Sequence, residues 1–217
     1  MPKPSSRILD IIHVFEEQNP HPEVELDFIN PFTLLIAVLL SAQATDKHVN
    51  KVTEALFKVI QKPQDVIDLG LEKLQDMVKS INYFRNKAKH IYAASQKLID
   101  DFNGEVPTTR KELMTLPGIG QKSANVILNV THNAPYIPVD THVFRVSQRI
   151  GLCKGKTPEE IERQLEAITP DKYLGRIGGW LVLHGRYICK AQKPLCEKCP
   201  ISAYCDYYKN VYSKSSK

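Results

Sequence analysis

The stretch Leu116-Pro117-Gly118-Ile119-Gly120-Gln121-Lys122-Ser123-Ala124-Asn125 decides the fold of this chain. Its two glycines favour a tight turn directly before a helix, and Lys122 falls just inside that helix. The free N–H groups at the start of a helix suit an anion such as a phosphate. The spacing of apolar residues predicts a helix over 108–115 and a second helix after the turn. The alternative is a corner whose glycines serve only packing.

The composition is that of an ordinary soluble globular protein. The 217 residues are 42% hydrophobic and 24% charged, which excludes a disordered chain. No apolar run reaches the roughly 18 residues that would span a bilayer, and the first six residues lead into an amphipathic pattern without a signal-peptide core. We therefore expect a cytoplasmic protein that has no membrane partner. The net charge of +5 agrees with a polyanionic partner without requiring one.

Helical spacing of apolar residues recurs along the whole chain, and no convincing strand pattern appears. The sequence therefore predicts an all-α fold. Residues 32–42 are apolar nearly all round, which predicts a buried central helix, whereas residues 23–29 are expected to form a loop. The other predicted helices cover residues 6–17, 46–61, 63–69, 71–81, 86–102, 139–150 and 158–168, the last with Thr157 as its cap.

Four of the five cysteines crowd into residues 189–205. Cys189, Cys196, Cys199 and Cys205 have the spacing C-x6-C-x2-C-x5-C, which lets one loop wrap four thiolates round one centre. Such sulfur ligation suits zinc or an iron–sulfur cluster, and the spacing alone leaves both open. Thiols without a metal are the third alternative. The same loop carries three lysines that are either solvated or in contact with phosphates.

Taken together, these motifs resemble the endonuclease III family of bifunctional DNA glycosylases and AP lyases, within the helix-hairpin-helix superfamily. The match runs almost end to end. The resemblance implies a six-helix domain over 24–134 and a discontinuous domain formed by 1–23 plus 135–217, with DNA bound between them and a [4Fe-4S] cluster as cofactor. The residues that carry the resemblance are Ser41 to Asp46, Leu116 to Asn125, Val139 to Arg145, Leu183 to Arg186 and the four cysteines.

The resemblance implies that Lys122 is the nucleophile and that Asp140 assists it. A neutral amine that attacks C1′ of the sugar expels the damaged base and leaves a Schiff base, from which the 3′ phosphate is lost by β-elimination. By itself, Lys122 could be a surface or phosphate-binding lysine. Asp140 could equally be a helix N-cap, and the two roles of Asp140 are compatible.

Further DNA-binding residues are implied by the same resemblance. Gln43 matches the residue that enters the gap left by a flipped base, although it could be only the polar end of a buried helix. Tyr83 stands where the family commonly has an aliphatic wedge, so an aromatic ring is expected to stack there instead. Gly118 and Gly120 would approach phosphates. His142 would lie near the damaged base, or it is structural.

The expected partner is double-stranded DNA that contains damaged pyrimidines or AP sites, bound by a monomer. Arg145 and Arg186 are expected either to hold the cysteine loop or to touch DNA. Three alternatives stay open at this point: a monofunctional adenine glycosylase of the same fold, a DNA-binding module without catalysis, and a zinc-stabilised helical interaction protein.

Overall fold

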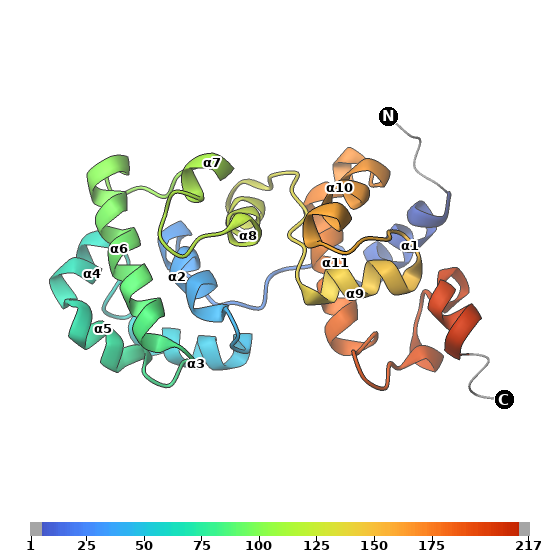
Figure 1. The fold of residues 1–217 in the computed structure, drawn as a ribbon, viewed down its shortest axis with the longest axis horizontal. Coiled ribbons are helices and arrows are strands. Elements are labelled where there is room, and N and C mark those ends of the chain that lie inside the picture. The colour runs from blue at the N-terminus through green and yellow to red at the C-terminus, as the bar shows by residue number, and fades with distance from the viewer. Residues whose placement is uncertain (1–5, 213–217) are drawn as a thin grey trace. The chain divides into compact units, whose positions relative to one another are not determined.

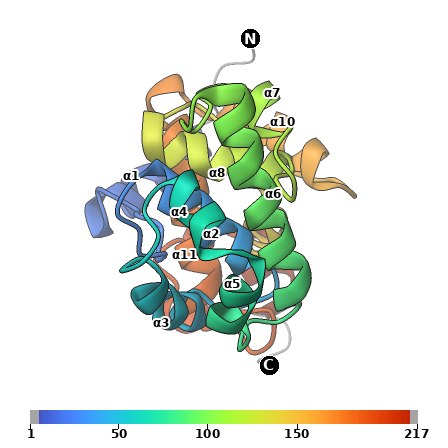
Figure 2. The same ribbon diagram turned by 90° about the vertical axis from the view of Figure 1, so that its left-hand side faces the viewer.

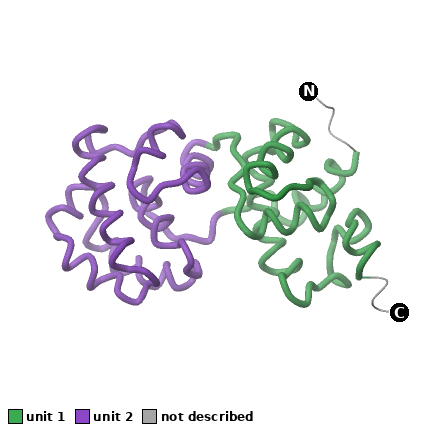
Figure 3. Tube along the Cα trace, viewed as in Figure 1, with its two compact units in different colours: residues 1–23, 133–217 green, residues 24–132 purple. Residues whose placement is uncertain are grey.

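The computed structural model describes residues 6–212, which form helices and no strand (Figure 1). The all-α prediction is therefore confirmed. Contacts divide the chain into two compact units: unit 1 joins Met1–Glu23 to Asn133–Lys217, and unit 2 is Val24–His132 (Figure 3). Among the described residues, no helix combines the length and the apolar character that crossing a membrane would need.

Unit 2 is built round α2 (Pro31–Ser41), in which every residue from Phe32 to Leu40 is buried. The prediction of a buried central helix is thus confirmed. Asn30 and Thr33 form a capping box that fixes its start, with Pro31 in the first turn. The helix contacts α3 (Asp46–Leu56), α6 (Phe84–Phe102) and α8 (Gln121–His132).

The remaining helices of unit 2 cover α6 and lead into the glycine turn. The short helices α4 (Pro63–Leu69) and α5 (Leu71–Val78) both pack against α6 (Figure 2). The four-residue α7 (Arg110–Leu113) precedes the turn, and it contacts α8, which follows the turn. Helix, glycine turn and helix are therefore arranged as the sequence predicts.

Several predicted helix boundaries are wrong. Helix α3 ends at Leu56 instead of residue 61, because Phe57 caps it and the backbone turns over residues 57–59 before Pro63 begins the next helix. Val59, predicted to be on the apolar face, is consequently 53% exposed. Helix α5 ends three residues early, and α7 begins only after its cap, Thr109.

Unit 1 has its own hydrophobic core. It packs α1 (Ser6–Gln18), α9 (Thr141–Ile150), α10 (Pro158–Ile168) and α11 (Leu174–Tyr187) around buried side chains. A 3-10 turn, η1 (Asp171–Tyr173), precedes α11, and the short turns η2 (Cys196–Lys198), η3 (Ser202–Tyr204) and η4 (Tyr208–Tyr212) follow it. The core includes Ile8, Ile12, Val143, Ile161, Trp180 and Ile201.

Candidate functional site

Gly118 occupies the position in the turn that only glycine suits. Its φ of +83° lies in the left-handed region. A Cβ added there would come within 2.8 Å of both His90 Nδ1 and Leu39 Cδ2. The turn therefore packs closely against α2 and α6, so that Gly118 serves packing as well as turn geometry.

Gly120 differs from Gly118 in its backbone conformation and in the space around it. The φ angle of Gly120 is not in the left-handed region, and a Cβ added to it would meet no atom within 4 Å. Its carbonyl accepts the N–H of Ala124 at 2.9 Å and so begins α8. Lys122 follows in the first turn of α8, and its side chain is exposed. The backbone beside the lysine is thus open to an approaching ligand.

Asp140 caps α9 in unit 1. Its Oδ1 accepts hydrogen bonds from the backbone N–H groups of His142 and Val143, both at 2.8 Å. The N-cap prediction is therefore confirmed. The other carboxylate oxygen, Oδ2, lies 3.2 Å from His142 Nδ1. The structure thus brings Asp140 and His142 together, whereas Lys122 belongs to unit 2.

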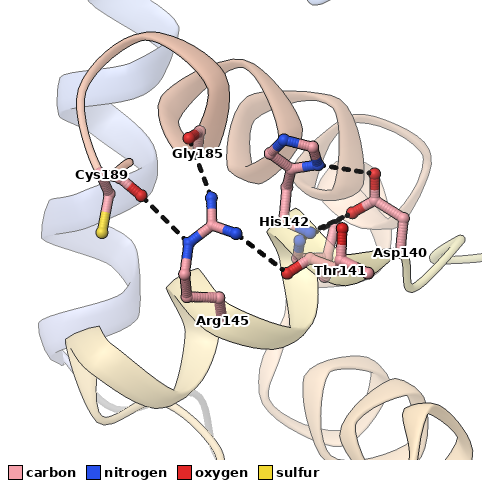
Figure 4. A network of polar contacts seen from close by, with 7 residues as sticks. Asp140, Thr141, His142, Arg145, Gly185 and Cys189 are labelled. Carbon is pink, nitrogen blue, oxygen red and sulfur yellow. Dashed lines mark hydrogen bonds and ion pairs between the residues drawn. The ribbon is translucent and has the colours of Figure 1, made fainter. Parts of the chain in front are cut away.

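Arg145 joins α9 to the start of the cysteine loop, as Figure 4 shows. Its guanidinium donates to the carbonyls of Cys189 at 3.2 Å, Gly185 at 3.0 Å and Thr141 at 3.4 Å. Of the two roles considered for Arg145, the structure supports holding the loop. Gly185 permits this close approach, because a Cβ there would lie 2.9 Å from that of His142.

Gln43 and Tyr83 both lie on exposed turns of unit 2. Gln43 follows α2 with a φ of +55°, and Tyr83 precedes α6 with a φ of +58°. Tyr83 is 65% exposed, so its ring is available for stacking on a base. Thr45 caps α3 immediately after Gln43 by accepting the N–H of His48.

The four clustered cysteines line one shared cavity, part of which is open to solvent. No group of three or more His, Cys, Asp or Glu side chains within residues 6–212 is positioned for a single metal ion. Burial, with a smaller contribution from the neighbouring cysteines, raises the pKa of Cys199 to about 11. Thiolates in this cavity therefore need positive charge, which an iron–sulfur cluster supplies.

Arg149 also holds the cysteine loop, a role that was not predicted from the sequence. Its side chain donates to the carbonyls of Lys190 at 2.7 Å and Ala191 at 2.9 Å, and it lies 3.6 Å from Cys189 Sγ. Its own carbonyl lies 3.5 Å from Cys205 Sγ. One residue thus contacts both ends of the loop. Basic residues commonly occur in the last turn of a helix because they interact with its free carbonyls. The position of Arg149 in the sequence therefore does not predict that it contacts the cysteine loop.

Two further buried side chains complete the surroundings. Burial lowers the pKa of His184 to about 4, so its ring is neutral at pH 7, and its Nε2 lies 3.6 Å from Cys199 Sγ. Cys153, the fifth cysteine, lies in the hydrophobic core of unit 1, where burial raises its pKa to about 12. Cys153 is therefore a core residue and does not line the cysteine cavity.

Comparison with known proteins agrees with this arrangement. Residues 36–171 match the family model for the HhH-GPD superfamily base excision DNA repair protein, and residues 189–205 match the iron-sulfur binding domain of endonuclease III. Endonuclease III of Rickettsia conorii is 51% identical over 93% of this chain and 96% of its own length. Endonuclease III of Escherichia coli K12 is 45% identical over 94% and 96%.

A solved structure described as a trapped endonuclease III–DNA covalent intermediate is also similar. It is 42% identical, covers 98% of this chain and 100% of its own, and superposes with a TM-score of 0.88. A non-covalent endonuclease III–DNA complex gives 41% identity and a TM-score of 0.89.

The helix-hairpin-helix and the cysteine loop define the class as a base-excision DNA repair protein with an iron–sulfur domain. Within that class, the chain belongs to the endonuclease III family. It is a bifunctional DNA glycosylase and AP lyase that binds DNA and carries a [4Fe-4S] cluster. The family decides against the adenine glycosylase, the binding module without catalysis and the zinc-stabilised protein.

Proposed function

We propose that this enzyme removes oxidised pyrimidines from duplex DNA through a covalent intermediate on Lys122 and then cleaves the strand 3′ to the AP site. The observation that carries the proposal is the position of Lys122: an exposed amine in the first turn of α8, directly after a turn that leaves the backbone open at Gly120. A related endonuclease III has been captured as a covalent intermediate with DNA, which agrees with a nucleophile on the protein.

The chemistry requires the damaged nucleotide to leave the base stack, since its C1′ atom is unreachable inside the duplex. The neutral amine of Lys122 attacks C1′ and gives up a proton, and the bond to the base breaks as the base takes up a proton. The sugar ring then opens at the C1′–O4′ bond, with a proton passing to O4′, and the Schiff base that forms acidifies C2′. Loss of the C2′ proton then expels the 3′ phosphate and breaks the strand.

In this proposal, Asp140 stabilises the positive charge that develops on the sugar. Two backbone N–H groups hold its Oδ1 at 2.8 Å, so the carboxylate is fixed before substrate binds. Its Oδ2 faces His142, which supports a role for His142 in orienting the carboxylate beside the damaged base.

Four further residues are proposed to contact the DNA. The exposed positions of Gln43 and Tyr83 support their filling the gap left by the flipped base and stacking on a neighbouring base. Gly118 and Gly120 are proposed to admit a phosphate to the N–H groups at the start of α8.

We also propose that Cys189, Cys196, Cys199 and Cys205 are the four cluster ligands, which their shared cavity supports. The cluster would fold the loop that presents basic side chains to the DNA backbone. We further propose two functional domains, over 24–134 and over 1–23 plus 135–217, whose boundary falls two residues after the one between the compact units, in a protein that works as a monomer.

Borohydride trapping on a duplex with one oxidised pyrimidine tests the nucleophile. Lys122→Gln should abolish both strand cleavage and the reduced protein–DNA adduct, while binding to the lesion duplex persists. Lys111→Gln is the matched control, because it removes the same charge from α7 in the same hairpin and should still form the adduct. An adduct formed by Lys122→Gln would mean that another amine is the nucleophile. Repeating the assay with uracil, thymine glycol and dihydrouracil tests the lesion class.

A further inference from the structure

Two exposed residues of unit 2 share a backbone conformation that side chains rarely adopt. Gln43 and Tyr83 both have φ values between +50° and +60°, in the left-handed region that is unfavourable for a residue other than glycine. Such a conformation persists only where the surrounding structure fixes it. Contacts with neighbouring residues must therefore hold the backbone of Gln43 and Tyr83 in this conformation.

The turn after α2 and the turn before α6 are tied to each other, although some 40 residues separate them. Asn82 Nδ2 donates to the carbonyl of Gln43 itself at 3.2 Å. His48, at the start of α3, lies with its Nε2 3.0 Å from the carbonyl of Ser80. These two contacts place the residues next to Tyr83 beside the turn that carries Gln43.

Lys87 makes the third and most buried link. Although it is a lysine, it is only 7% exposed, and its ammonium donates to the carbonyl of Leu40 at 2.8 Å and to that of Ala42 at 2.5 Å. These carbonyls lie at the C-terminal end of α2, where partial negative charge gathers and helical partners run out. Burial lowers the pKa of Lys87, and the two hydrogen bonds offset that cost.

The backbone of Lys87 is joined to the other turn. Its N–H donates to the carbonyl of Tyr83 at 3.1 Å, in the first turn of α6. A single residue thus contacts Tyr83 through its main chain and Ala42, the neighbour of Gln43, through its side chain.

We propose that Lys87 is a positioning residue that holds Gln43 and Tyr83 in one fixed relative geometry for entry into damaged DNA. This inference rests on the DNA roles proposed above for those two residues. An amide that hydrogen-bonds an unpaired base and a ring that stacks on its neighbour must arrive together, because binding groups work only when held to within about 0.5 Å.

Single-turnover cleavage of two DNA substrates tests the proposal. One is a duplex with a central dihydrouracil, in which extrusion of the base leaves a gap. The other is a single strand with one AP site, which has no opposite strand and therefore no gap to fill. Lys87→Met keeps the length of the side chain but cannot donate. It should slow cleavage of the duplex by about 10- to 100-fold and change cleavage of the single strand by no more than roughly twofold.

Lys97→Met is the matched control. Lys97 lies further along the same helix and makes only an exposed ion pair with Asp101, which contributes little to stability. Both rates should stay unchanged in this variant. Combining Lys87→Met with Gln43→Ala adds a second readout: if Lys87 acts through Gln43, the double variant should be less impaired than the product of the two single losses.

Two results would overturn the proposal. Equal losses on duplex and single strand would mean that Lys87 serves only the fold, and no loss on either would mean that the link is dispensable. Should Lys87→Met fail to fold, Asn82→Ala at the exposed end of the same link asks the same question, and it must slow the duplex selectively. Failure of the proposed function itself is distinguishable, because the unsubstituted protein would then form no borohydride adduct on either DNA.

Discussion

Gly118 has no room for a side chain, whereas Gly120 has open space around it. The first glycine combines a φ of +83° with close approach to His90 and Leu39. The second has neither constraint. The two glycines look equivalent in the motif, but they are needed for different reasons. Gly118 is required by the backbone conformation and by packing, whereas Gly120 leaves the backbone open to a ligand.

Gly118→Ala should therefore lower the free energy of unfolding by about 1–3 kcal/mol, since alanine is strained at this φ and its methyl group meets two side chains. Gly120→Ala is the control within the same turn, and its stability should change by less than about 0.5 kcal/mol. Urea unfolding measures both. Gly120→Ala should instead weaken binding to an AP-site duplex, because the methyl group would obstruct a phosphate. Equal destabilisation by the two substitutions would contradict this assignment.

Asp140→Asn should reduce turnover by about 10²-fold or more while the fold is retained. Asparagine is as good an N-cap as aspartate, but it lacks the negative charge that the transition state needs. Single-turnover excision and thermal unfolding measure the two effects separately. Asp140→Ala is the companion variant, and it should lose about 1 kcal/mol of stability as well. An unchanged excision rate in Asp140→Asn would reduce Asp140 to a cap.

At the scale of residues, the sequence predicted the parts of the site that lie in local motifs. The cap made by Asp140 and the exposure of Tyr83 depend on neighbours in the chain. Lys87 and Arg149 were missed because their partners are about 40 residues away. One signal was present for Lys87: it shares a helical face with Ile91, Ala94 and Leu98, and a charged residue on an apolar face needs buried partners.

At the scale of elements, the cysteine loop depends on α9. Arg145 and Arg149 lie one turn apart on that helix and donate to carbonyls at the start of the loop. Arg149 also stacks on the ring of Tyr207, with its guanidinium carbon 4.8 Å from the ring centroid. The loop has only short 3-10 turns of its own, so this helix provides much of its support.

Arg149→Met should accelerate loss of the cluster by on the order of tenfold, as expected when a group that supports metal ligands is removed. The decay of the iron–sulfur absorption in the presence of a chelator measures the rate, and iron per chain measures the starting occupancy. Arg163→Met, on the exposed face of α10, is the matched control and should lose its cluster at the original rate. Equal rates for all three proteins would show that Arg149 does not support the loop.

Helix starts were predicted better than helix ends. Thr157 and Asp140 cap their helices as expected, because a cap is a contact over two or three residues. The end of α3 was predicted too late, since the apolar spacing continues past Leu56 whereas the backbone already turns over residues 57–59. Periodicity records which side chains are apolar and does not record where the backbone turns.

At the scale of the whole molecule, each unit has a separate hydrophobic centre: α2 in unit 2 and the core of α1, α9, α10 and α11 in unit 1. The cysteine loop belongs to unit 1 alone. The all-α class was predictable from periodicity. The packing of α1 with the C-terminal part of the chain was expected only from the resemblance to a family.

Removal of the cluster should therefore loosen unit 1 selectively. Hydrogen exchange measured by mass spectrometry, before and after oxidative loss of iron, should show faster exchange in α9, in α11 and across residues 189–205. Exchange in α2 and α8 should stay the same, because different regions of a protein open independently. The affinity for an AP-site duplex should fall in the same sample. Uniform acceleration throughout the chain would contradict the independence of the two cores.

The pairing of α1 with the last part of the chain has a consequence for biosynthesis. Arg7 donates to the carbonyl of Tyr204 at 2.8 Å and pairs with Asp206 at 2.9 Å, while Ile8 shares a core with Ile201. The first helix to leave the ribosome thus meets its core partners on α9 only after about 130 further residues, and the partners of Arg7 after almost 200, a delay of about 10–40 s for the last of them at usual translation rates. Unit 2 can fold during that interval, and the apolar face of α1 stays available to chaperones until the later helices of unit 1 are made.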